Sequence, residues 1–388
     1  MTIVYKYNER QDKFGYYTVD NLKFYSKFDA MLAEQRTGNA LKWNFNDHIY
    51  SSYNWSQEPT DSIDELYRQR AQQLRDQYDY LVLWFSGGAD SANILNAFIE
   101  HDIKLDEVVS WTNLDATGDR ENSLNAEIFN FATVLADRAK QKQPNLKHRI
   151  VDISRSTMEF YSQNDNKFDW MYYASAHYSP NTLARQNIAL TVRDWTEMFT
   201  AGKKVGFIYG IEKPSVSEFN GQFYFKFSDM CIDVANSSII QILDRPWEFN
   251  ELFYWSPDCP EIVIKQAHLI KRYLTTTRNV SEYEPRKSMT AAPVQTVIDK
   301  NISFMRNDVM HRIIYPWWEP NPWQYKSPSN IVSIKDNWFF DQTDNEQSKR
   351  VWKMGIEELW RRTPDKWKYD PADVSKGIRS CLSPIYKL

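Results

Sequence analysis

Hydrophobic residues recur along this chain with two different periods, and the alternation of these periods predicts the architecture. The expected strands are short runs of β-branched and aromatic residues at 80–85, 107–112, 148–153 and 204–210. The expected helices have apolar residues every three or four positions and span 62–78, 91–101, 121–142 and 181–199. Strands that alternate with such helices predict βαβ units, and therefore an α/β fold with a Rossmann-like parallel sheet and helices on both faces.

Two flanking regions depart from this alternation. Residues 1–60 contain strand candidates and a short helix, and their aromatic residues indicate packing against a neighbouring part of the chain. Residues 216–388 contain helix candidates at 261–274 and 344–362 and an aromatic stretch rich in Trp and Pro, so we expect this region to be mostly helical. We therefore divide the chain into an N-terminal α+β extension over 1–60, an α/β core over 61–215 and a C-terminal substrate or lid region over 216–388.

Composition excludes several classes of protein. The chain has 47 Lys and Arg against 51 Asp and Glu, and this net charge of −4 gives no global attraction to nucleic acid or to an anionic membrane. Cys231, Cys259 and Cys381 stand far apart, which argues against a disulfide framework, a zinc ribbon or a cysteine-bound iron–sulfur cluster. No apolar run approaches the roughly 20 residues that a membrane helix needs, and we find no signal peptide. We therefore expect a cytoplasmic protein with no membrane partner.

The stretch SGGADS, Ser86 to Ser91, stands where the first strand of the expected sheet gives way to a helix. Ligands of open parallel sheets bind outside the carboxyl ends of the strands. Gly87 and Gly88 allow the backbone to approach a ligand closely, and free N–H groups at a helix N-terminus form a cradle for phosphate oxygens. The hydroxyls of Ser86 and Ser91 are further donors to the same oxygens.

Asp90 follows Ala89 in this loop, and a carboxylate among phosphate-binding groups requires a bridging cation. Mg²⁺ prefers such an arrangement, in which one carboxylate and several phosphate oxygens share the ion. The chain contains neither G-x-x-x-x-G-K-[ST] nor G-x-G-x-x-G, which excludes a Walker loop and a dinucleotide-binding fingerprint. These features predict a magnesium–nucleotide phosphate site with Asp90 as a metal ligand.

The motif S-G-G-x-D-S after the first strand of such a sheet resembles the PP-loop of the ATP pyrophosphatase superfamily. That superfamily includes the synthetase domain of asparagine synthetases, GMP synthetase, tRNA thiolases and the phosphoadenosine-phosphosulfate reductases. The resemblance covers roughly residues 61–215. It implies an adenine nucleotide alpha hydrolase-like fold, a loop that holds the pyrophosphate portion of ATP, Mg²⁺ as cofactor, and cleavage at the α-phosphate to give an adenylated intermediate.

The end of the fourth strand, YGIEKP, should lie on the same rim of the sheet as the loop. Gly210 opens the backbone there, Glu212 is a candidate second ligand of Mg²⁺, and Lys213 is a candidate to neutralise charge between the α- and β-phosphates. The segment is loosely similar to the turns after the corresponding strand in asparagine synthetases and in the reductases, and it matches neither closely. An ordinary Glu-Lys turn is the alternative.

The end of the second strand, Trp111-Thr112-Asn113, should lie beside the adenine if the sheet is wound as in the superfamily. Trp111 then either stacks on the base or packs in the core. The charged residues of the following loop are interpreted as a solvated turn: Asp115, Asp119 and Arg120.

Arg185 and Arg193 fall on one face of the expected helix 181–199 and are candidates to reach ATP phosphate or an acidic substrate, with a surface face as the alternative. The aromatic C-terminal stretch is interpreted chiefly as packing, and in the alternative as a wall for a planar substrate; it contains Trp317, Trp318 and Trp323. The locally basic segment 345–388 permits a contact with nucleic acid without requiring one.

In the favoured hypothesis, the protein is an adenylating ligase. An acceptor carboxylate or carbonyl oxygen attacks the α-phosphorus of ATP, and ammonia or an amine then displaces AMP, which requires little beyond positioning and electrostatic stabilisation. Residue 2 is Thr rather than the Cys of a glutamine-hydrolysing domain, and residues 1–60 are too few for one. Ammonia would therefore come from a partner or from solution. The acceptor stays open between a small molecule, a nucleotide and a nucleic acid.

Two other hypotheses stay open. Sulfur-transfer or sulfonucleotide chemistry occurs in the same superfamily, but the cysteines are isolated, and SCLSP around Cys381 lacks the Glu-Cys-Gly-x-His pattern of the reductases. This matters because a sulfur carrier needs an activated thiolate. The third hypothesis is a non-catalytic nucleotide-binding or assembly protein, and the intact loop argues against such degeneration.

Overall fold

The computed structural model describes residues 9–163, 179–180, 192–211, 213–214, 216–219, 221–229, 250–276, 307–323, 336–341, 346–368 and 378–388. Within these residues, no helix is both long enough and apolar enough to cross a membrane.

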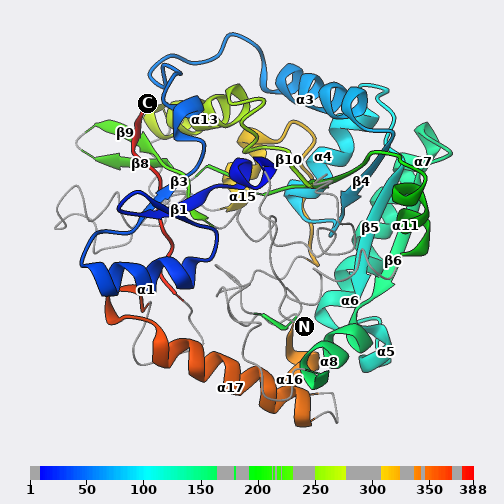
Figure 1. Ribbon diagram of the computed structural model, residues 1–388. Coiled ribbons are helices and arrows are strands. Elements are labelled where there is room, and N and C mark those ends of the chain that lie inside the picture. Colours follow the sequence, from blue (N-terminus) through cyan, green and yellow to red (C-terminus); the bar gives the residue numbers. More distant parts are fainter. Residues whose placement is uncertain are drawn as a thin grey trace.

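A five-stranded sheet forms the centre of the fold, and all of its strands run parallel (Figure 1). Its order is β10-β7-β4-β5-β6. The strands are β4 (Tyr80–Trp84), β5 (Glu107–Thr112), β6 (Lys147–Asp152), β7 (Val205–Tyr209) and β10 (Asn250–Leu252). The prediction of a parallel, Rossmann-like α/β sheet is therefore confirmed. The fifth strand, β10, was not expected because three residues are too few to display a period.

Seven described helices lie before and between these strands. They are α3 (Ile63–Gln77), α4 (Ala89–Ile99), α5 (Leu114–Thr117), α6 (Ser123–Glu127), α7 (Thr133–Lys142), α8 (Ser154–Gln163) and α11 (Arg193–Thr200). The expected helix 121–142 contains a π-helical segment, η2 (Ile128–Ala132), between α6 and α7. The expected cap of α3 is present, since the Ser62 side chain accepts a hydrogen bond from the Glu65 N–H at 3.1 Å.

Side chains of β7 show that helices lie on both faces of the sheet. A Cβ at Gly210, just beyond β7, would lie 3.1 Å from Ile94 Cδ1 of α4. Phe207 has the opposite parity along the strand, and its ring centre lies 5.0 Å from that of Trp195 of α11. Because successive side chains of a strand point to opposite faces, α4 and α11 cover opposite sides of the sheet.

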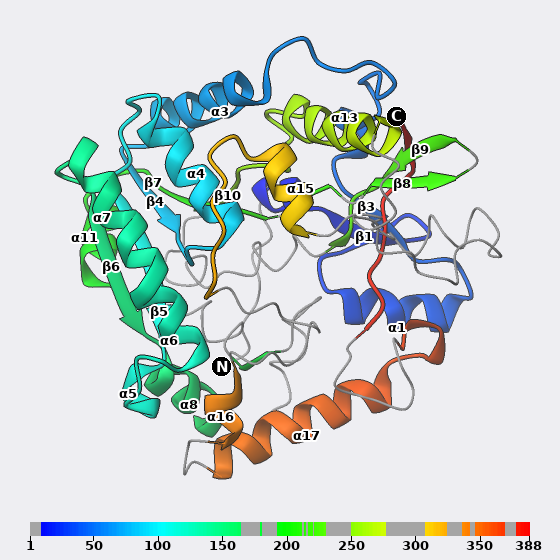
Figure 2. The same cartoon turned by 180° about the vertical axis from the view of Figure 1, so that it is seen from behind.

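The N-terminal residues pack against the C-terminal part of the chain (Figures 1 and 2). One antiparallel sheet has the order β2-β1-β3, and a second has the order β11-β9-β8. Their strands are β1 (Tyr16–Val19), β2 (Leu22–Phe24), β3 (Lys42–Asn44), β8 (Val216–Phe219), β9 (Gln222–Phe225) and β11 (Tyr386–Lys387). Buried rings join the two regions: Phe45, Tyr50, Trp55, Phe225, Phe227, Trp255 and Tyr386.

Further helices surround these sheets. They are η1 (Glu9–Phe14), α1 (Lys27–Thr37), α2 (Asp47–Tyr50), α13 (Glu261–Thr276), α15 (Asn307–Ile314), α16 (Asn337–Asp341), α17 (Glu346–Arg362) and η6 (Asp365–Trp367). Helix α17 starts beside α8, where Ser348 donates a hydrogen bond to the Met158 carbonyl. Just after its end, Lys366 pairs with Glu34 of α1 at 2.6 Å. This helix therefore bridges the parallel sheet and the N-terminal region along one side of the molecule (Figure 1).

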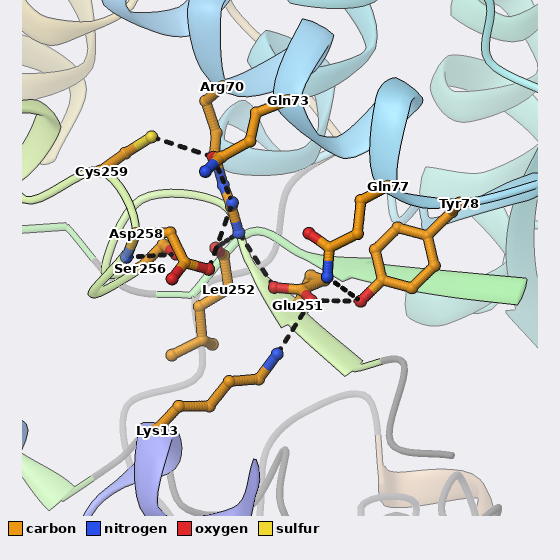
Figure 3. Close-up of polar contacts among 10 residues, drawn as sticks. All are labelled: Lys13, Arg70, Gln73, Gln77, Tyr78, Glu251, Leu252, Ser256, Asp258 and Cys259. Carbon is orange, nitrogen blue, oxygen red and sulfur yellow. Dashed lines mark hydrogen bonds and ion pairs between the residues drawn. The ribbon is translucent and has the colours of Figure 1, made fainter. Parts of the chain in front are cut away.

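A buried carboxylate, Glu251 of β10, ties three parts of the fold together (Figure 3). Arg70 of α3 lies 3.0 Å from it and also donates to the Leu252 carbonyl at 2.9 Å. Lys13 of η1 lies 2.9 Å from the other carboxylate oxygen, to which the Tyr78 hydroxyl also donates. Burial opposes ionisation of Glu251, but the two cations and the Tyr78 hydroxyl lower its pKa below the ordinary value.

Candidate active site

The candidate site lies where the order of the sheet reverses. From β4 the chain continues to β5 and β6 on one side, and then returns to place β7 and β10 on the other. The carboxyl ends of β4 and β7 therefore form a switch point, at which ligands of open α/β sheets bind. The SGGADS loop follows β4, and Gly210 and Lys213 follow β7.

Gly87 shapes the loop and fixes it to its surroundings. Its φ is +74°, a backbone conformation that favours glycine. A Cβ there would also lie 2.9 Å from the Ala132 Cβ and 3.0 Å from the Ala132 Cα. The glycine is therefore required both for the turn and for close packing on η2. Gly88 is the N-cap of α4, so Ala89, Asp90 and Ser91 form the first helical turn, two residues earlier than expected.

Hydroxyl and amide groups of the loop converge on the start of α4. Ser86 Oγ accepts a hydrogen bond from the Gly88 N–H at 3.2 Å and lies 3.5 Å from Ser91 Oγ. Ser91 Oγ donates to the Gly88 carbonyl at 3.2 Å. Among the described residues, no side chain caps the N-terminus of α4. Its first N–H groups and the positive end of the helix dipole are therefore suited to an anion.

Asp90 is held by partners from three other parts of the chain. Lys213 Nζ lies 2.9 Å from Oδ2 and 3.2 Å from Oδ1, and the Tyr315 hydroxyl donates to Oδ1 at 2.5 Å. The Tyr254 hydroxyl donates to the Asp90 backbone carbonyl at 2.7 Å. Burial would raise the pKa of Asp90, but the charges of Lys213 and His311 and the Tyr315 hydrogen bond outweigh it and lower the pKa. Asp90 is therefore an anchored carboxylate.

Gly210 brings Lys213 to this carboxylate. A Cβ at Gly210 would lie 3.3 Å from the Asp90 Cβ, so the end of β7 passes directly against the first turn of α4. Lys213 follows three residues later, and its side chain is 19% exposed. The structure therefore brings Asp90, Gly210 and Lys213 together at one rim of the sheet, and it adds that the two charges form an ion pair.

Several residues of the site come from the C-terminal region and were missed in the sequence. Tyr315 stacks on His311 with ring centres 5.5 Å apart, and the Tyr254 hydroxyl accepts a hydrogen bond from Asn93 at 3.0 Å. Asn321 Nδ2 lies 3.4 Å from the Gly87 carbonyl. No local motif marks these residues, because each reaches the loop only through the fold.

The Trp-rich stretch runs past α4 on its way to the loop (Figure 2). The Trp317 ring centre lies 5.7 Å from that of His101, just beyond the end of α4. Trp318 packs partly buried against the core, and the Trp323 N–H donates to Asn321 Oδ1 at 2.9 Å. The stretch thus packs on the molecule, as the sequence chiefly indicated, and Asn321 is its contact with the loop.

Trp111 and Thr112 at the end of β5 contact the neighbouring strands β4 and β6. Trp111 packs on Trp84, with ring centres 6.0 Å apart. Thr112 is buried and donates a hydrogen bond to Asp152 at 3.2 Å. Asn113 is fully buried, and its side-chain amide has no hydrogen-bond partner among the described residues. The adenine-binding role expected for this strand end stays a prediction.

The other expected residues either fall outside the described part of the chain or lie at its surface. Glu212 and Arg185 lie outside the described residues. Arg193 is exposed on α11 and pairs with Glu197 at 2.7 Å, consistent with the surface alternative. The charged residues after β5 were interpreted as a solvated turn. Asp119 and Arg120 are exposed after α5, and the Arg120 guanidinium lies over the Phe129 ring, but Asp115 lies within the short helix α5, where its N–H donates to Asp152.

The described residues contain no group of three or more His, Cys, Asp or Glu side chains that would hold a metal by themselves. Asp90 is a single carboxylate with a 27% exposed side chain, beside a helix N-terminus suited to phosphate. Mg²⁺ is commonly bound by one or two carboxylates, substrate phosphates and water. The donor set therefore fits Mg²⁺ that arrives with a nucleotide, and does not fit a resident structural metal.

Comparison with known proteins gives no assignment: no family model matches the chain, and no curated protein is significantly similar to it.

Proposed function

We propose that this protein is an ATP pyrophosphatase-type enzyme that adenylates an acceptor, with Mg²⁺ as its cofactor. The observation that carries the proposal is the junction of β4 and α4. A glycine loop at the switch point of a parallel sheet opens onto a helix N-terminus that no described side chain caps. Such a junction suits phosphate oxygens, and Lys213 adds positive charge from the neighbouring strand.

Each residue of the site has a physical role in this proposal. The first N–H groups of α4 and the hydroxyls of Ser86 and Ser91 donate to the oxygens of the leaving pyrophosphate. Lys213 stabilises the negative charge that develops on those oxygens. Asp90 would hold Mg²⁺, which when bound would neutralise part of the phosphate charge.

The chemical step forms one bond to phosphorus and breaks another. An acceptor oxygen attacks the α-phosphorus, and the bond from that phosphorus to the bridging oxygen of the β-phosphate breaks. Pyrophosphate leaves with the electron pair. An amine or ammonia then displaces AMP from the adenylated acceptor. The protein contributes positioning and fixed charges, which are the contributions that its residues offer.

The described cysteines favour this chemistry over sulfur transfer. Cys259 is half-buried and donates a hydrogen bond to Gln73, and burial raises the pKa of its thiol. Cys381 is buried, and burial raises the pKa of its thiol well above the usual range. Nucleophilic sulfur chemistry needs a thiolate, and both environments keep the thiol protonated. Cys231 lies outside the described residues.

Release of pyrophosphate from ATP tests the proposal. The protein with ATP and Mg²⁺ should form AMP and pyrophosphate when the right acceptor is supplied from panels of carboxylic acids, nucleosides and RNA. Lys213→Met should slow this reaction by about 100-fold, the loss typical for one group that stabilises developing charge. Lys203→Met is the matched control, because Lys203 is exposed just before β7 and should not affect the rate. Absence of both pyrophosphate release and Mg–ATP binding would refute the proposal.

A further inference from the structure

The Asp90 carboxylate serves two functions that compete for the same atoms. Lys213 Nζ spans both carboxylate oxygens at 2.9 and 3.2 Å. The metal role assigned to Asp90 requires at least one of these oxygens. A divalent cation and the Lys213 ammonium cannot both occupy this position without strong repulsion between their like charges. Binding of a cation at Asp90 therefore displaces Lys213.

A displaced Lys213 would remain close to the proposed phosphate site. The lysine follows β7 at the switch point, next to the first turn of α4, where the phosphates are proposed to bind. While it is paired with Asp90, much of its charge is neutralised. A Lys213 side chain that leaves Asp90 regains its full charge beside the phosphate cradle. Its long, flexible stem allows the ammonium to move between the two positions.

We propose that the Asp90–Lys213 ion pair makes binding of the nucleotide and of the divalent cation mutually dependent. The cation takes Asp90 and releases Lys213 to the phosphates, and the phosphates attract Lys213 and open Asp90 to the cation. The inference rests on the proposed function, because it takes the loop as the phosphate site. By linkage, each ligand must strengthen binding of the other by the same factor.

Tyr315 makes the exchange possible without loss of the carboxylate position. Its hydroxyl donates to Asp90 Oδ1, and its ring lies in a buried cluster, with the Tyr254 ring centre 5.5 Å away. This neutral donor does not compete electrostatically with a cation. Tyr315 therefore keeps Asp90 oriented whichever cation the carboxylate faces.

Calorimetric titration with ATP, in chelator and in Mg²⁺, tests the coupling. Wild-type protein should bind ATP much more tightly with Mg²⁺ than without it. Asp90→Asn leaves Lys213 without its carboxylate, so metal-free ATP should bind more tightly than to wild type, by roughly tenfold and within the usual range of coupling factors. The same variant should lose most of the enhancement by Mg²⁺.

Asp90→Asn would also gain affinity for metal-free ATP simply because it removes a negative charge near an anion site. The double variant Asp90→Asn/Lys213→Met separates the two causes. If the gain acts through Lys213, the double variant should bind metal-free ATP no better than Lys213→Met alone. A gain of equal size in the Lys213→Met background would overturn the proposal. Lys203→Met, which changes an exposed lysine just before β7, is the control and should leave metal-free affinity at the wild-type value.

Lys213→Met also tests the coupling without any change at Asp90. Mg²⁺ should improve ATP binding to this variant less than it does to wild type, because no ammonium is released. An undiminished effect of Mg²⁺ would contradict the inference while leaving the proposed function intact. Failure of wild-type protein to bind ATP in Mg²⁺ would remove both.

Discussion

The buried carboxylate of Glu251 allows a quantitative test of how the fold is held together (Figure 3). The perturbation is Glu251→Gln, which preserves shape and removes one negative charge. In the folded protein, Glu251 is 1% exposed and Arg70 is fully buried. The variant would leave the charges of Arg70 and Lys13 without their buried counterion.

The loss of stability in Glu251→Gln depends on whether Lys13 and Arg70 can lose their charge or find another partner. Lys13 can lose its proton, because burial already lowers its pKa below the ordinary value despite the attraction of Glu251. Arg70 cannot lose its proton, and its next carboxylate, Asp258, is 48% exposed and 3.8 Å away. Loss of one partner from a buried pair costs about 3–5 kcal/mol. That is a large part of the roughly 5–15 kcal/mol that stabilises a typical domain.

Urea denaturation measures this loss. Far-UV circular dichroism and tryptophan fluorescence should be followed together, because a single free energy of unfolding requires coincident transitions. Glu65→Gln is the matched control: it makes the same chemical change on an exposed carboxylate that pairs with Arg68, and should shift the midpoint little. Arg70→Met combined with Glu251→Gln should recover part of the loss, since neither charge then remains unpaired.

Equal midpoints for Glu251→Gln and Glu65→Gln would refute this reasoning. They would mean that the Arg70 charge is solvated or neutralised in a way that its full burial does not allow. A double variant less stable than Glu251→Gln alone would point instead to packing of the Arg70 side chain as the main contribution.

Two further predictions concern stability. Gly87→Ala should lower the urea midpoint more than Gly118→Ala: both positions have positive φ, which costs about 1–2 kcal/mol with a Cβ, but only at Gly87 does the Cβ meet Ala132. Equal losses would contradict close packing there. Two causes lower the pKa of His148 to about 4: the larger is burial, and the smaller is repulsion from the charge of Lys140. The folded state therefore favours the neutral imidazole of His148. The stability linked to this residue is fully present above the unfolded pKa of roughly 6.5 and is lost as the pH falls towards 4. In His148→Gln, the free energy of unfolding should depend less on pH between about 6.5 and 4. The same pH dependence as in wild type would contradict this prediction.

Much of the parallel sheet was predictable because each of its longer strands carries its own period. The runs at β4, β5 and β7 are β-favouring and largely buried, β6 is a β-favouring strand at the exposed edge of the sheet, and capping residues such as Ser62 mark where a helix starts. β10 could not be found in this way, since Asn250–Leu252 contains a polar residue, an acidic residue and a leucine. It becomes a strand because β7 offers an open edge and Arg70 neutralises Glu251.

Helix α13 shows a second limit of sequence patterns. Its existence was predicted, but the local pattern does not reveal that the polar side chains of Lys265 and His268 are buried. His268 hydrogen-bonds to the Trp55 carbonyl at 2.8 Å, and Lys265 donates to the Pro59 carbonyl at 2.9 Å. Polar side chains can be buried where the backbone supplies partners. The partners here come from a segment some 200 residues away, which no local pattern reveals.

The SGGADS loop carries a negative charge next to a proposed anion site, and no residue of the loop carries a positive charge. Asp90 in the first turn of α4 is stabilised by the helix dipole, and it would therefore compete with the phosphate of the proposed nucleotide for the same positive field. A short motif can place both features, but it cannot supply the positive charge that lets them coexist. That charge comes from Lys213 after β7, and the orientation comes from Tyr315 after α15. The glycines thus mark a candidate site in the sequence, whereas the electrostatic balance of that site depends on the contacts of Gly210, Lys213 and residues 307–323 with α4 and its loop.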